Sequence, residues 1–255
     1  MEGKKMMRLK SGMKAMRWLF LVAALILCGF VTCGWCDQSD YYGTYAGSFS
    51  GDDHGIWVAV ITSDFSDSVF LSYSTDSGTG DGGYVGYIDE SGTVGHFMSY
   101  SQMFGTMVDG YIDASDGSVS GTWDNASSSA SGTLTGSAVT SCAYAGSYSG
   151  TFGGDASGTW SITIDDNGYA TGTMTSSGGT GTFKGGCHPD GHVIVFGQDG
   201  YGYNFAVYGQ ISGSSISGEW SSESGDAGTI STGTAASDSG GGGGGGCFIL
   251  SLIGG

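Results

Sequence analysis

The chain has 255 residues, of which 52 are glycine and 13% are aromatic, without the G-X-Y period of collagen or the aromatic-poor composition of a disordered chain. Acidic residues outnumber basic residues by 24 to 7, and only Lys184 among the basic residues lies after residue 17. Because nucleic-acid binding and adsorption to anionic lipid both require clusters of cations, the composition excludes both for the region after residue 17.

Residues 1–36 are predicted to be an export signal. Six basic residues precede an apolar run of 14 residues, whereas a membrane-spanning helix usually needs about 20. Small residues near the end of the segment allow cleavage there; an uncleaved N-terminal anchor, or lipidation at Cys33 or Cys36, is the alternative. We therefore expect an exported bacterial protein, secreted or held at the cell surface, whose membrane contact is confined to this segment or to the C-terminal tail.

The region after the signal contains two copies of one unit, residues 41–137 and 143–234, joined by a linker at 138–142. Four landmarks recur in the same order in both copies. The clearest pairs are YAGSFSGDDHGIW with YSGTFGGDASGTW, and SVSGTW with SISGEW. The repeat predicts that the chain follows the same path twice.

Within each copy, apolar and polar residues alternate with the period of a β-strand, as in WSITID, where Trp160, Ile162 and Ile164 share one face. Turn sequences such as DDNG and SSGG separate these runs every 8–12 residues or so, which predicts about eight short strands per copy. Eight antiparallel strands most economically close into a meander barrel, because closure removes the exposed edges. We expect two tandem all-β barrels; a β-sandwich in each copy, or one larger barrel formed by both, is the alternative.

A Gly-x-Trp sequence recurs in both copies, as SGTW and SGEW. We expect an inward glycine to let the neighbouring tryptophan ring lie across the interior and to permit tight coiling of the strands. Gly-Thr-Trp also occurs in the first strands of avidin-like and lipocalin-like barrels, which the copies resemble in spacing and composition. This resemblance implies a barrel architecture, and no ligand-contact motif of either family is present to carry a function over.

Cys142 and Cys187 both lie in the second copy, and neither has a cysteine at the corresponding position of the first. An exported protein folds where disulfides persist, so we predict a bond between these two residues. If the cysteines of the signal segment are removed with it, Cys247 is left as the odd cysteine.

The segment CHPDGH offers potential metal ligands in His188, Asp190 and His192. Its spacing matches no standard zinc pattern and Asp-Gly is an ordinary turn signature, so we predict a turn, with metal binding as the alternative. The sequence GSYSG resembles a nucleophile elbow but lacks the helix that such an elbow requires. We therefore expect no enzyme and no cofactor.

Aromatic residues are the main candidates for ligand contact. They are Trp57, Trp123, Trp160, Trp220, Tyr201 and Tyr203. Such side chains either fill a small barrel or hold a sugar or another small ligand. We expect a non-catalytic secreted or cell-surface β-repeat protein with a structural, adhesive or binding role and a partner in the cell envelope or on a surface. The alternative is a carbohydrate- or small-ligand-binding barrel, which needs an internal cavity.

Residues 235–255 are expected to form a disordered tail, in which seven glycines precede Cys247 and a short apolar segment. The glycine run followed by Cys-Phe-Ile resembles a C-terminal tail found on some exported bacterial surface proteins. The resemblance implies attachment or processing at Cys247 through a disulfide, a lipid or a sorting enzyme, although the longer hydrophobic tract and basic end of anchored C-termini are missing. We therefore predict a tether whose reactive point is Cys247; an inert end is the alternative.

Overall fold

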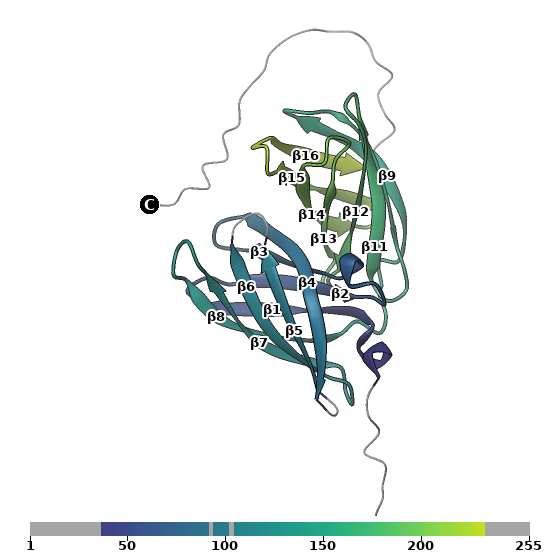
Figure 1. The fold of residues 1–255 in the computed structure, drawn as a ribbon. Helices are drawn as coiled ribbons and strands as arrows, with labels where there is room; N and C mark the ends of the chain where they lie inside the picture. Colours follow the sequence, from purple (N-terminus) through teal and green to yellow (C-terminus); the bar gives the residue numbers. More distant parts are fainter. Residues whose placement is uncertain (1–36, 92–93, 102–104, 233–255) are drawn as a thin grey trace, which may run out of the picture. The chain divides into compact units, whose positions relative to one another are not determined.

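The computed structural model describes residues 37–91, 94–101 and 105–232, so that the predicted signal segment and C-terminal tail lie outside the described residues (Figure 1). The described chain forms two closed eight-stranded antiparallel β-barrels in tandem. This topology confirms the predicted fold class and excludes both the sandwich and the single larger barrel. The helices of the described ranges are two short 3-10 turns, η1 (Gln38–Tyr41) and η2 (Phe65–Asp67), and neither has the length or hydrophobicity needed to cross a bilayer.

Barrel 1 is a meander in which each strand pairs with the next and the last strand pairs back with the first. Its strands are β1 (Gly43–Gly51), β2 (Gly55–Ile61), β3 (Val69–Ser74), β4 (Thr79–Ser91), β5 (Val94–Ser101), β6 (Thr106–Asp113), β7 (Ser118–Asn125) and β8 (Ser131–Ala138). The closing pair sets Tyr45 of β1 opposite Ala138 of β8. Closure pairs both edges of the sheet and so removes the surfaces on which another strand would add.

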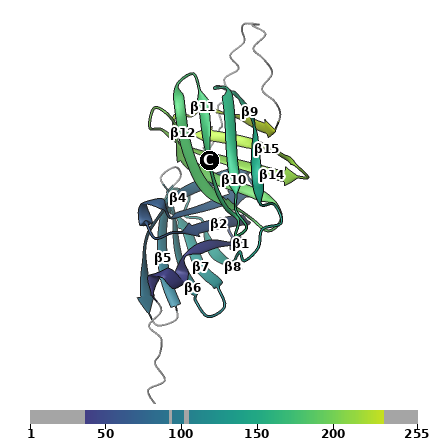
Figure 2. The ribbon, with the colours of Figure 1, turned by 90° about the vertical axis from the view of Figure 1, so that its right-hand side faces the viewer.

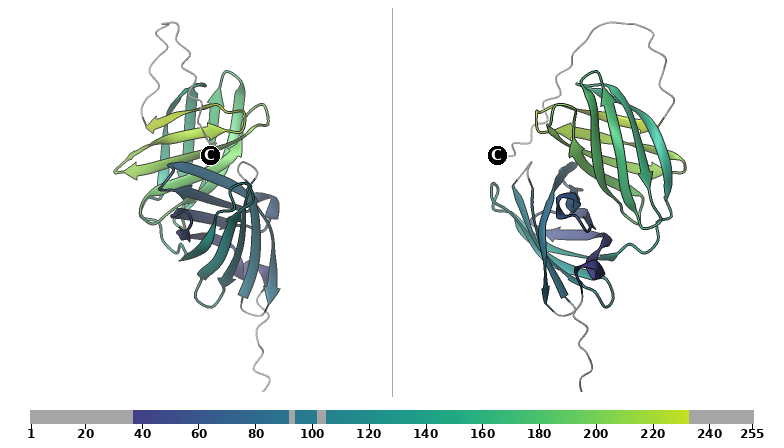
Figure 3. Two further views of the ribbon diagram at one scale, coloured as in Figure 1. Left: turned by 90° about the vertical axis from the view of Figure 1, so that its left-hand side faces the viewer. Right: turned by 45° about the vertical axis from the view of Figure 1, so that its right-hand side comes forward.

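Barrel 2 repeats this plan, and its last strand again closes on its first (Figure 2). Its strands are β9 (Gly146–Gly154), β10 (Gly158–Ile164), β11 (Tyr169–Ser176), β12 (Gly179–Cys187), β13 (His192–Gln198), β14 (Asn204–Ser212), β15 (Ser215–Ser222) and β16 (Ala227–Thr232). Two further views show the strands of each barrel closing around its interior (Figure 3). The strands β9–β16 fall within the second repeat that the sequence defines, and β1–β8 match the first except that β8 ends at Ala138, one residue inside the predicted linker.

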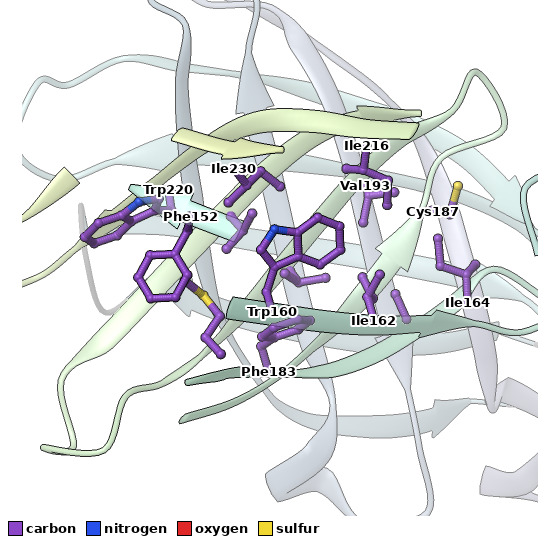
Figure 4. Close-up of a cluster of buried hydrophobic side chains, with 14 of the residues drawn as sticks. Phe152, Trp160, Ile162, Ile164, Phe183, Cys187, Val193, Ile216, Trp220 and Ile230 are labelled. Carbon is purple, nitrogen blue, oxygen red and sulfur yellow. The ribbon is translucent and has the colours of Figure 1, made fainter. Parts of the chain in front are cut away.

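Each barrel encloses a hydrophobic core that the alternating sequence pattern produces. In β10, Trp160, Ile162 and Ile164 are buried, whereas Ser161 and Thr163 are exposed. The buried side chains of barrel 2 converge from facing strands onto the ring of Trp160 (Figure 4). The predicted inward and outward faces of this strand are therefore confirmed.

Equivalent aromatic pairs close both cores in the same geometry. Phe49 contacts Trp123 edge-to-face, with ring centroids 5.8 Å apart and an interplanar angle of 80°. Phe152 contacts Trp220 at the same separation and the same angle. The two repeats therefore share their internal packing as well as their strand order.

Glycines make room for the tryptophan rings, but they are not the glycines of the Gly-x-Trp sequence. A Cβ atom on Gly132 would lie 2.5 Å from Trp123 Nε1, and one on Gly228 would lie 2.6 Å from Trp220 Nε1. A Cβ on Gly121 would instead meet the backbone of the adjacent strand β6. The ring therefore covers a glycine on the following strand. That glycine also permits close approach of another backbone, since its Cβ would lie 1.9 Å from the carbonyl oxygen of Ser50 for Gly132 and 1.8 Å from that of Gly153 for Gly228.

Several strands in the described ranges, among them β2, β3, β13 and β14, bury residues on both faces. β2 reads GIWVAVI, and all of its residues except Ile56 are buried, because Trp57 and Ala59 point into barrel 1 while Val58 and Val60 point out. The outward residues join apolar side chains of the second barrel in one cluster, which comprises Ala46, Val58, Val60, Val69, Leu71, Val139, Ile194, Phe196 and Ala206. Residues 37–232 lie within one compact unit, in which β2 contacts β12, β3 contacts β12 and β13, and β4 contacts β13 and β14. Continuous apolar runs, rather than alternating ones, are typical of strands covered on both sides.

Candidate functional site

The four predicted tryptophans fill the barrel interiors. Trp57 has no exposed surface, and Trp123, Trp160 and Trp220 are each less than 10% exposed. Each indole also satisfies its polar group internally, because Nε1 donates to a backbone carbonyl oxygen of another strand of the same barrel at 3.0–3.2 Å. Buried rings with satisfied N–H groups form a rigid core.

Barrel 2 has little internal space. A cavity of about 20 Å³ lies against Trp160, Met174 and Phe183, and one of about 70 Å³ lies at the end of the barrel near Tyr201. Ligand pockets for small molecules usually measure roughly 300–1,000 Å³. The cavities lined by Trp160 and Trp220 are therefore much smaller than a typical ligand pocket.

The structure separates the two predicted tyrosines from the tryptophans. Tyr201 and Tyr203 are 72% and 48% exposed, in the turn between β13 and β14. The carboxylate of Asp199 accepts hydrogen bonds from both of their amides at 2.9 Å, which fixes the turn. Tyr201 lies across Gly178 of the neighbouring hairpin turn, where any larger residue would collide with its ring. These tyrosines therefore form an exposed aromatic tip and not part of an internal pocket.

A larger cavity lies outside the barrels, on the outer face of β10–β13. It has a volume of about 580 Å³ and is bounded by Tyr84 and Asp67 of barrel 1. Ser161, Thr173 and Thr182 stand opposite one another on the adjacent strands β10, β11 and β12, which lie side by side in Figure 2. We call this feature the outer groove. It presents a row of hydroxyl groups to solvent.

Aromatic and charged groups border the outer groove. Burial, followed by the nearby Asp67 carboxylate, raises the pKa of Tyr84 and of Tyr169, so both phenols stay neutral at physiological pH. Lys184 forms an ion pair with Asp67, and its ammonium group lies 6.0 Å from the centroid of the Tyr84 ring. The groove therefore combines hydroxyl groups, phenol rings and one paired cation.

Sequence reasoning missed the outer groove. Its signal was the outward set of alternating threonines and serines, which includes Ser161, Thr163, Thr171, Thr173 and Thr182. The alternation itself identifies only which residues face inward and which face outward. The pairing that brings these residues of separate strands together depends on the strand register, which the sequence pattern does not specify.

Cys142 and Cys187 are brought together, as free thiols in this structure. The amide of Cys142 donates to the carbonyl oxygen of Asp166 at 2.7 Å, and the amide of Cys187 donates to that of Gly168 at 2.8 Å. Burial, followed by the adjacent Cys142 thiol, raises the pKa of Cys187. The predicted disulfide stays a prediction, with both partners anchored on one turn.

His188, Asp190 and His192 converge at the turn between β12 and β13. Nδ1 of His188 and Nδ1 of His192 each lie 2.7 Å from Oδ1 of Asp190. Burial opposes ionisation of Asp190, but hydrogen bonds from the His192 amide and from both imidazoles hold its pKa below its usual range. The structure therefore confirms a turn here and assembles a two-imidazole, one-carboxylate cluster within it.

The proposed attachment residue Cys247 lies outside the described residues. A search of family models, of curated proteins and of solved structures found no match to this chain in any of the three.

Proposed function

We propose that this chain is a non-catalytic exported protein that acts outside the cell or at the cell surface in a structural, adhesive or binding role. The observation that carries the proposal is the burial of the four tryptophans inside the barrels, where the cavities lined by Trp160 and Trp220 measure about 20 and 70 Å³. Recognition then falls to the outer surface. The chain has 24 acidic and 7 basic residues, and a net charge far from zero favours solubility outside the cell.

The proposal includes a tether at Cys247. The seven glycines before this residue provide a flexible spacer, so that attachment at Cys247 leaves the barrels free to reach a partner in the cell envelope or on another surface.

Cell fractionation combined with mass spectrometry of both chain ends tests the proposal. We expect the protein in the medium or on the cell surface, without residues 1–36 or with these residues retained as an anchor. A Cys247→Ser variant should move from the cell-associated fraction to the medium, whereas Cys142→Ser should not. Accumulation of the intact chain in the cytoplasm would contradict export, and an unchanged distribution of Cys247→Ser would contradict the tether alone.

A specific observation favours a second function, carbohydrate binding in the outer groove. Sugars are bound by hydroxyl-rich surfaces with aromatic rings at their borders, and the groove offers the hydroxyls of Ser161, Thr173 and Thr182 beside the ring of Tyr169. Its volume of about 580 Å³ lies in the range of ligand sites.

A glycan array tests this second function. The chain should bind a defined set of glycans, and Thr173→Ala should weaken that binding. Thr229→Ala is the matched control, because Thr229 is an exposed strand threonine of the same barrel that does not line the groove. The groove is not a glycan site if Thr173→Ala and Thr229→Ala lose glycan binding equally, or if the parent chain binds no glycan on the array.

A further inference from the structure

We propose that the turn between β12 and β13 is a binding site for a divalent transition-metal ion of the zinc class, with His188, Asp190 and His192 as its ligands. The inference is independent of the proposed surface role. Its basis is a three-residue cluster whose donor atoms lie within 4.8 Å of one another and whose residues differ from those at the corresponding positions of barrel 1.

The ligand atoms converge. Nδ1 of His188 and Nδ1 of His192 each lie 2.7 Å from Oδ1 of Asp190, and the three atoms lie within 4.8 Å of one another. Zinc binds imidazole nitrogen at about 2.0–2.1 Å and carboxylate oxygen at about 2.0–2.2 Å, which sets ligand atoms of one tetrahedral ion about 3.3 Å apart. An outward adjustment of roughly half an ångström per contact therefore accommodates the ion.

The imidazole rings are held in place. The side chains of His188 and His192 are 16% and 27% exposed. The ring of His192 stacks on Tyr208 of β14, with centroids 5.4 Å apart and an interplanar angle of 21°. Rings confined in this way lose little conformational entropy when they bind an ion.

The backbone of the turn is equally fixed. The amide of His188 donates to the carbonyl oxygen of His192 at 2.7 Å, and the amide of Gly191 donates to that of His188 at 2.9 Å. Gln210 Nε2 donates to the carbonyl oxygen of Asp190 at 3.2 Å. The ligands therefore project from a turn whose own hydrogen bonds do not depend on a metal.

The barrel fold does not require these three residues. In the sequence alignment of the repeats, GYIDESGTV of barrel 1 corresponds to GGCHPDGHV of barrel 2. The residues at the corresponding positions are Asp89, Ser91 and Thr93. Barrel 1 pairs β4 with β5 on either side of this segment, with Ser91 opposite Val94. The histidines are therefore a feature of barrel 2 and not a condition for its closure.

The donor set selects the ion. Imidazole nitrogen suits zinc, copper and nickel, whereas calcium and magnesium prefer oxygen ligands alone. The side chain of Asp190 is 46% exposed, so solvent reaches the cluster and water can complete the coordination. Three protein ligands with one open position match the ligand number of an accessible zinc site.

A second cluster, Asp53, His54 and Asp76, provides an internal comparison. Its donor atoms also lie within 4.8 Å of one another, with His54 Nδ1 2.8 Å from Asp76 Oδ2. However, the side chains of His54 and Asp76 are 60% and 56% exposed, and the cluster offers a single imidazole. We expect this cluster to bind zinc much more weakly.

The test uses the full chain and its own repeat as the control. Binding of Zn²⁺ is measured by titration calorimetry in the parent chain, in a variant carrying His188→Asp, Asp190→Ser and His192→Thr, and in His54→Ala. The triple variant takes the residues that stand at the corresponding positions of barrel 1, and tryptophan fluorescence verifies that it is folded. We expect the parent to bind one equivalent more than the triple variant, and His54→Ala to retain that equivalent.

Imidazole NMR signals give a second readout. The chain has four histidines, so Zn²⁺ should shift the ring signals of His188 and His192 and leave those of His54 and His96 in place. A Cys142→Ser variant should bind Zn²⁺ as the parent does, because the proposed site contains no cysteine ligand. Equal zinc binding in the parent and the triple variant, loss of the equivalent in His54→Ala, or unshifted His188 and His192 signals would overturn the proposal.

Discussion

Tyr73 of β3 stacks on Tyr208 of β14, with ring centroids 3.3 Å apart and ring planes 4° apart. The pair joins the outer faces of the two barrels beside the apolar cluster that contains Leu71 and Phe196. Burial, followed by the neighbouring Tyr73, raises the pKa of Tyr208, which keeps the phenol neutral at physiological pH.

A double-mutant cycle measures this contact. Tyr73→Leu and Tyr208→Leu should show a coupling free energy of about 0.5–1.5 kcal/mol in urea unfolding, because each substitution removes the partner of the other ring. Tyr73→Leu combined with Tyr201→Leu is the control, since Tyr201 is 72% exposed at the end of barrel 2. Additivity of the Tyr73 and Tyr208 substitutions would show that the stacked pair does not stabilise the interface.

The glycine beneath each inner tryptophan should be intolerant of a side chain. Gly228→Ala places a Cβ atom 1.8 Å from the carbonyl oxygen of Gly153 and 2.6 Å from Trp220 Nε1. We therefore expect it to push β16 away from β9, break the hydrogen bond from the indole to Gly153, and lower the free energy of unfolding by about 1–3 kcal/mol. Trp220 fluorescence should shift to the red as water reaches the indole. Gly153→Ala is the matched control, because a Cβ there meets nothing within 4 Å. Equal stability of the two variants would refute the assigned role of Gly228.

Asp81 should make the stability of barrel 1 depend on pH. Burial raises the pKa of its carboxyl, and hydrogen bonds from Ser101 and from the Gly82 amide offset this only in part. The stability contributed by a group with a raised folded-state pKa is complete below the unfolded pKa of 3.8 and is lost as pH rises through the folded-state value.

Asp81→Asn should therefore raise the free energy of unfolding at pH 7 and raise it less near pH 4. Urea unfolding at both pH values checks this expectation. Asp124→Asn, at an exposed position of barrel 1, should change neither value appreciably. A larger gain for Asp81→Asn at acid pH than at neutral pH would contradict the sign of the effect.

Oxidation should join Cys142 to Cys187. The bond would close a loop that stabilises the folded chain by about 3–4 kcal/mol in the chain-entropy model. Peptide mapping without reductant should detect the linkage in the exported protein, and Cys142→Ser should lower the melting temperature to that of the reduced parent, whereas Cys247→Ser should not. If both thiols of the exported protein react with a trapping reagent after unfolding without reductant, the disulfide is not formed.

The barrels could be predicted from the sequence because apolar and polar residues alternate along each strand, and this alternation marks the inward face. Alternation in WSITID places Trp160, Ile162 and Ile164 inside, and the recurrence of the same landmarks predicts the second copy. The continuous apolar run of β2 carried the signal for a second buried face, but it did not indicate which surface covers Val58 and Val60. In the structure, Val58 and Val60 belong to one buried cluster with Ile194 and Phe196, which lie more than 130 residues away in the chain.

The candidate sites also differ in whether the sequence could predict them. His188, Asp190 and His192 are close in sequence, so their convergence at one turn was accessible from the pattern. The outer groove was not, because Ser161, Thr173 and Thr182 become neighbours only through the register of three strands. The covering of Gly132 by Trp123 likewise depends on the pairing of β7 with β8.

The indole N–H signals of the barrel tryptophans test the central claim that the protein's own side chains fill both barrels. We expect the NMR signals of Trp57, Trp123, Trp160 and Trp220 to exchange slowly with solvent, because each N–H is hydrogen-bonded inside a barrel. These signals should also stay in place when the chain is titrated with hydrophobic ligands and glycans. A ligand that shifts any of the four while the fold is retained would show that a barrel interior is a binding site and would contradict the account.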